Sequence, residues 1–144
     1  MEAPKLLAPR EPNEYSLLRP MGSFTFAPLV SAEMNATAEL VVTLLRPEPP
    51  GNLLTQGGDI DNRLKTLFDA LTMPRHLNAL AIGSTPSADE APFFCLLEDD
   101  NLVTSIQVKT EQLLEQVEDP ALVDLFINVR TRITRITFKN MILG

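Results

Sequence analysis

One segment of this 144-residue chain has a clear helical period, and strand-like sequences flank it on both sides. Apolar residues recur along one face of the predicted helix, at Ile60, Leu64, Leu67, Phe68 and Leu71. Asp59 or Asp61 can cap the N-terminus of this helix, and Pro74 ends it. A chain that contains both a helical period and strand-like segments is expected to form a domain in which helices pack against a sheet.

Four segments have the alternation and composition of β-strands. They are 22–30, 38–45, 102–109 and the β-rich part of 121–136. The first two are expected to pair as a hairpin, and 110–117 is expected to form a second, short helix. The order β-β-α-β-α-β predicts a small α+β fold with a mixed, mainly antiparallel sheet and helices packed on one face.

The length of the chain suits one domain with one hydrophobic core. Residues 1–20 are rich in proline and have no clear period, which predicts an extended N-terminal arm before a folded domain at 21–144. No apolar run approaches the roughly 20 residues that cross a bilayer, and the first residues do not resemble a secretory signal. Cys95 is the only cysteine, which excludes an intrachain disulfide. We therefore expect a soluble, cytoplasmic protein with no membrane partner.

Carboxylates stand at two places where they can hold a metal ion. Asp59 and Asp61 begin the predicted helix, and Asp100 lies in a turn after the apolar run 93–97. Mg²⁺ prefers oxygen ligands, so these three aspartates can hold one ion that activates water and neutralises a phosphate. Lys65, one turn after Asp61, can contact the same phosphate or the leaving oxygen.

A structural interpretation of the same residues stays open. Aspartates are common at helix caps and in turns, so the three carboxylates can serve these purposes alone. Lys65 can likewise pair with Asp61 or Asp69 on a solvated helix face. The short pattern by itself does not decide between the two interpretations.

A longer match favours the metal site. The stretch GDIDNRLKTLFDAL, followed by LEDDNLV, resembles the core of the RusA-like Holliday-junction resolvases. That family has an Asp-x-Asp-Asn motif, a lysine four residues after the second aspartate, an Asp-Ala-Leu helix end and a later Asp-Asp pair. The resemblance covers about residues 38–109, and it places the family's metal-binding aspartates at Asp59, Asp61 and Asp100 and its catalytic lysine at Lys65.

The resemblance implies an endodeoxyribonuclease that uses Mg²⁺ or Mn²⁺ to cleave four-way DNA junctions in recombination and repair. It also implies a homodimer that nicks two strands symmetrically. Two alternatives remain: an inactive relative that serves as an interaction module, and a metal nuclease that acts on other branched DNA or on single strands. The segment 72–92 is longer than the corresponding link in the family, and loops of this length are usually functional or mobile.

The net charge of −7 argues against nucleic-acid binding, because domains that bind DNA are usually basic. Two features reduce the conflict. Carboxylates that hold a divalent cation are neutralised in the working state, and residues 128–144 carry basic residues and no acid. Among these, Arg130 and Arg132 are expected on one face of the last strand, where they can contact phosphate.

The remaining candidate residues are expected to be structural. His76 is the only histidine and is expected at the surface, whereas Cys95 is expected to be buried and inert. Phe24 and Phe26 alternate in the first predicted strand and are expected to lie in the core.

Overall fold

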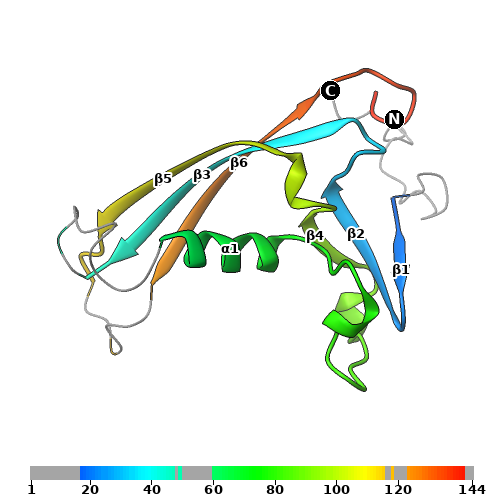
Figure 1. The fold of residues 1–144 in the computed structure, drawn as a ribbon, viewed down its shortest axis with the longest axis horizontal. Coiled ribbons are helices and arrows are strands. Elements are labelled where there is room, and N and C mark those ends of the chain that lie inside the picture. Colours follow the sequence, from blue (N-terminus) through cyan, green and yellow to red (C-terminus); the bar gives the residue numbers. More distant parts are fainter. Residues whose placement is uncertain (1–16, 48, 50–59, 116–117, 119–122, 142–144) are drawn as a thin grey trace, which may run out of the picture.

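A computed structural model describes residues 17–47, 49, 60–115, 118 and 123–141 of the chain (Figure 1). Its strands and α-helix are, in chain order, β1 (Arg19–Met21), β2 (Phe24–Val30), β3 (Ala36–Arg46), α1 (Ile60–Leu71), β4 (Phe93–Leu97), β5 (Val103–Gln112) and β6 (Asp124–Ile133). Short 3₁₀ turns lie at η2 (Leu77–Ala79), η3 (Ala88–Glu90) and η4 (Asp100–Leu102). Over the described residues the protein is therefore an α+β fold, as predicted.

The strands of the described residues form two three-stranded sheets. In one sheet β2 lies between β1 and β4, and in the other β3 lies between β5 and β6. Both sheets are mixed, because each central strand has one antiparallel and one parallel neighbour. Figure 1 shows α1 along one face of the β5-β3-β6 sheet, with the β1-β2-β4 sheet beyond the C-terminal end of the helix.

β3 is the centre of the hydrophobic core. Its sequence places small and aliphatic residues at every second position, so they point to one face of the sheet. The buried residues of this face are Ala36, Ala38, Leu40, Val42 and Leu44. The neighbouring strands continue the face, since Val42 pairs with Val108 of β5 and with Ile127 of β6.

α1 packs on this core through the apolar stripe that its sequence predicts. The helix residues that contact the buried cluster are Ile60, Leu67, Phe68 and Leu71. At the end of the helix Thr72 forms a β-bridge with Leu97, and Met73 N donates to Leu97 O at 2.9 Å. These contacts fix the last turn of α1 beside the end of β4.

The β1-β2-β4 sheet has an aromatic core. Phe24 and Phe26 are stacked with their ring centroids 5.9 Å apart. Phe93 of β4 meets both rings edge-on, at centroid distances of 6.4 and 5.5 Å. The prediction that Phe24 and Phe26 lie in the core is confirmed, since they are 9% and 3% exposed.

The predicted hairpin between 22–30 and 38–45 is wrong. Both segments are strands, but β2 and β3 belong to different sheets. β3 pairs instead with β5, which follows α1 and β4 in the chain, and a connection of that length allows parallel pairing. The expectation of one mainly antiparallel sheet is corrected to two mixed sheets for the same reason.

The predicted second helix at 110–117 is also wrong over the described residues. β5 continues from Thr110 to Gln112, because these residues pair with the last residues of β3. After the strand, Leu113 N donates to Arg46 O at 2.7 Å. Pairing with a long central strand therefore outweighs the local helical pattern.

The N-terminal arm falls mostly outside the described residues, which begin at Leu17. The predicted boundary at residue 20 lies within β1, which pairs with β2 from Arg19↔Phe26 to Met21↔Phe24. Gly22 turns the chain between these two strands with a φ of +61°, a conformation that glycine adopts without strain.

Candidate functional site

α1 carries two of the predicted site residues on one side. Asp61, Lys65 and Asp69 lie one helical turn apart, and all three are exposed. Asp61 is in the first turn, where the positive end of the helix dipole stabilises a carboxylate. Asp59 lies outside the described residues, so its role as a metal ligand stays a prediction.

Asp100 lies in the turn that follows β4. Leu97 ends this strand and is completely buried. Two residues later, the Asp99 side chain accepts a hydrogen bond from Asn101 N at 2.9 Å and caps η4. Asp100 begins η4 with its side chain half exposed. A buried strand end and a capped turn thus determine where the Asp100 carboxylate lies.

A pocket of about 540 Å³ joins the helix and this turn. Lys65 and Asp100 both line it, so two predicted site residues from distant parts of the sequence share one cavity. The other lining residues are Asp69, Thr72, Met73, Pro74, Arg75 and Ala79. Asp61 lies outside this lining, one turn before Lys65 on the same side of α1.

Arg75 is a pocket residue that the sequence did not single out. Its Nη2 lies 2.8 Å from Asp100 Oδ1 and 3.3 Å from Asp99 Oδ1. The residue belongs to the segment 72–92, where only the unusual length indicated a function and no spacing motif marked a side chain. In this structure the Asp100 carboxylate is therefore paired with a cation of the same chain.

The two aspartates of the turn have different environments. The pKa of Asp99 is lowered from its ordinary value, mainly by the hydrogen bond from Asn101 N and further by Asp100 and the charge of Arg75. Asp99 thus stays ionised at neutral pH and stabilises the turn itself. Asp100 lines the pocket, where its carboxylate can meet a ligand.

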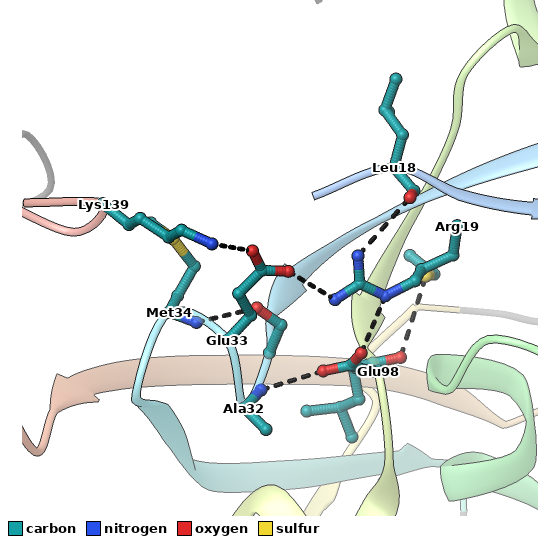
Figure 2. A network of polar contacts seen from close by, with 10 residues as sticks. Leu18, Arg19, Ala32, Glu33, Met34, Glu98 and Lys139 are labelled. Atoms are coloured by element: carbon teal, nitrogen blue, oxygen red, sulfur yellow. Dashed lines mark hydrogen bonds and ion pairs between the residues drawn. The ribbon is translucent and has the colours of Figure 1, made fainter. Parts of the chain in front are cut away.

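A polar network anchors the residue that precedes this turn (Figure 2). Arg19 donates from Nε to Glu98 Oε1 and from Nη2 to Glu33 Oε2, both at 3.0 Å. Glu98 Oε2 also accepts from Ala32 N at 2.9 Å, and Lys139 pairs with Glu33. Strand β1, the connection between β2 and β3, and the C-terminal segment are thereby tied to the start of the turn.

The donor set fits a hard divalent cation in its chemistry. Asp61 and Asp100 offer carboxylate oxygens, which Mg²⁺ and Mn²⁺ prefer over nitrogen or sulfur. In the part of the chain that the structure describes, no three Asp, Glu, His or Cys residues are grouped so that they could hold a metal ion. Mg²⁺ is often held by one or two carboxylates together with substrate phosphate and water, so the chemistry of these side chains suits such a site, although Asp61 lies outside the pocket lining that contains Asp100.

The remaining candidate residues lie outside the lining of this pocket. His76 is exposed, as predicted. Cys95 is half-buried, and burial raises the pKa of its thiol to about 11, with a smaller effect from the charge of Glu98. Arg130 and Arg132 share a face of β6, where Arg132 pairs with Glu39 of β3.

No protein-family model matches the sequence, and no curated protein or solved structure is significantly similar to it. Among the described residues, no helix has both the length and the apolar character needed to cross a membrane.

Proposed function

We propose that this chain is a Mg²⁺- or Mn²⁺-dependent endonuclease of the RusA-like type, which cleaves four-way DNA junctions. The observation that carries the proposal is the pocket that Lys65 and Asp100 share. The two residues come from the helix and from the Asp-Asp turn, which are the two motifs on which the family resemblance rests. A fold that separated them would have removed the basis for a common site.

Each proposed site residue has a role that follows from its chemistry. A divalent cation supplies an activated water molecule and neutralises charge on the scissile phosphate. Asp61 and Asp100 would hold the cation, with Asp59 as the further predicted ligand. Lys65 would donate a hydrogen bond to a phosphate oxygen or to the leaving oxygen, since it lines the same pocket as Asp100.

The proposal includes branched DNA as the substrate and a homodimer as the active form. Two copies of the site would make the two symmetric nicks that resolve a junction. Lys65 and Arg75 are the cationic residues of the pocket lining, beside Asp69 and Asp100, in a chain whose net charge is −7. Contacts between such residues and phosphate oxygens position a protein on DNA.

Cleavage of a synthetic four-way junction tests the proposal. With Mg²⁺, the wild-type protein is expected to make paired nicks in the junction and none in a linear duplex, and chelation of the metal should stop the reaction. Faster cleavage of flaps or single strands would instead indicate a metal nuclease with another substrate. Absence of cleavage of every DNA by a folded protein would contradict the proposal.

The acidic charge favours a second candidate, an inactive relative that serves as a protein-interaction module. A net charge of −7 opposes contact with a phosphate backbone. An electrophoretic mobility shift assay separates the two candidates. Junction binding would favour the nuclease, whereas a folded protein that binds no DNA would favour the interaction module.

A further inference from the structure

The ion pair between Arg75 and Asp100 stands at the predicted metal site. Arg75 Nη2 lies within hydrogen-bond distance of an Asp100 oxygen, at 2.8 Å. A divalent cation binds a carboxylate oxygen at about 2.0–2.6 Å. A guanidinium and a divalent cation that both contact one carboxylate repel each other, so each of them weakens the binding of the other.

We infer that Arg75 competes with the divalent cation for Asp100 and is displaced from this carboxylate when the cation binds. The inference rests on the proposed function, because it takes Asp100 as a metal ligand. It adds a residue from the long segment 72–92 to the site, and it assigns this residue a direct effect on metal affinity.

The fold places Arg75 at this position. Met73 N donates to Leu97 O at 2.9 Å, so the chain that leaves α1 is tied to the strand that leads to the Asp-Asp turn. Pro74 restricts the backbone immediately before Arg75. The arginine therefore projects from a fixed backbone into the pocket that Asp100 also lines.

The ion pair is weak enough for a cation to displace it. The side chains of Arg75 and Asp100 are 58% and 50% exposed, and water screens the attraction between charges as exposed as these. A divalent cation carries twice the charge of the guanidinium and bonds to the oxygen directly. Exchange of one for the other therefore requires the loss of only a weak contact.

Asp99 keeps Arg75 close to the site after the exchange. Its Oδ1 lies 3.3 Å from Arg75 Nη2, and its position is fixed by the hydrogen bond from Asn101 N. Asp99 can thus remain paired with Arg75 while Asp100 binds the cation. The guanidinium donors that leave Asp100 are then available to a phosphate oxygen, for which arginine has the matching geometry.

Binding of Mn²⁺ to the full chain in the absence of DNA tests the inference, with isothermal titration calorimetry as the measurement. Arg75→Gln is expected to bind Mn²⁺ roughly two- to tenfold more tightly than the wild type, as the loss of a weak exposed ion pair allows. Arg135→Gln is the matched control, because it removes the same charge outside the pocket. Addition of Asp100→Asn to Arg75→Gln should abolish the gain in affinity.

Two results would overturn the inference, and they are distinguishable. Equal affinities of Arg75→Gln and the wild type, with binding that still depends on Asp100, would show that Arg75 does not compete while Asp100 remains a ligand. No binding, or binding that Asp100→Asn does not weaken, would show that Asp100 does not hold the cation. Junction cleavage by the wild-type protein remains the separate test of the proposed function.

Discussion

Leu97 links the hydrophobic core to the turn that carries Asp100, and its replacement by alanine tests how firmly this turn is held. The side chain is 0% exposed and belongs to the same buried cluster as Val30 and Leu40. Its carbonyl also accepts the hydrogen bond from Met73 N that ties the end of α1 to β4. Leu97 therefore contacts both of the elements that form the candidate site.

Leu97→Ala is expected to lower the free energy of unfolding by about 3 kcal/mol, within the roughly 2–5 kcal/mol range for truncation of a buried leucine. The loss combines the transfer free energy of the removed carbons with the cavity that they leave. In a domain of this size a change of ~3 kcal/mol lowers Tm by about 10 °C. Leu97→Met keeps the side-chain volume and is expected to cost less than about 1.5 kcal/mol.

Urea denaturation followed by circular dichroism measures these changes. Leu114→Ala is the matched control, because this leucine is 90% exposed and its truncation should change stability by less than about 0.5 kcal/mol. If Leu97→Ala unfolds at the same urea concentration as Leu114→Ala, the position of Leu97 in the core is wrong. The proposed anchoring of the Asp-Asp turn would then be refuted with it.

Three further predictions concern groups outside the pocket. Asn140→Ala should lower the free energy of unfolding, measured by urea denaturation, by about 2–3 kcal/mol. The Asn140 side chain is 2% exposed and forms hydrogen bonds with Met34 O, Arg135 O and Thr137 N. A decrease below about 0.5 kcal/mol would contradict its structural role. Cys95, with a thiol pKa of about 11, should react with iodoacetamide at about pH 8 far more slowly in the folded than in the urea-unfolded chain, and equal rates would contradict its burial. The pKa of Glu33 is lowered by its hydrogen bonds from Lys139 and Arg19, so its contribution to stability is fully present above the ordinary value of 4.5 and is lost as the pH falls through the lower folded-state pKa. Glu33→Gln should therefore reduce the loss of stability between about pH 6 and about pH 3, and an unchanged loss in urea titrations would contradict the network.

Local patterns predicted most elements of the fold. The spacing of Ile60, Leu67 and Phe68 identified α1, alternation identified β2 and β5, and a run of β-favouring residues identified β3. Strand pairing was not predictable in the same way, because the partners of β3 lie far away in the chain. Proximity in the sequence suggested a hairpin with β2, whereas burial of both edges of β3 is achieved by β5 and β6.

The residues of the candidate site were predictable only where they belong to a sequence motif with a characteristic spacing. Lys65 and Asp100 were expected to meet, and the structure places both in one pocket. Arg75 was not expected, because a single arginine in an irregular segment has no spacing that distinguishes it. Its importance depends on a tertiary contact with Asp99 and Asp100 that only the folded chain reveals.

The central claim is that Asp61, Lys65 and Asp100 form one metal-dependent site, and junction cleavage by charge-neutral variants tests it most directly. Asp61→Asn and Asp100→Asn keep the size of each side chain, and Asp124→Asn is an exposed control at the start of β6. We predict that both site variants lose the Mg²⁺-dependent paired nicks while they retain wild-type circular dichroism and junction binding, and that the control cleaves normally. Cleavage by Asp61→Asn and Asp100→Asn at the wild-type rate would contradict the account.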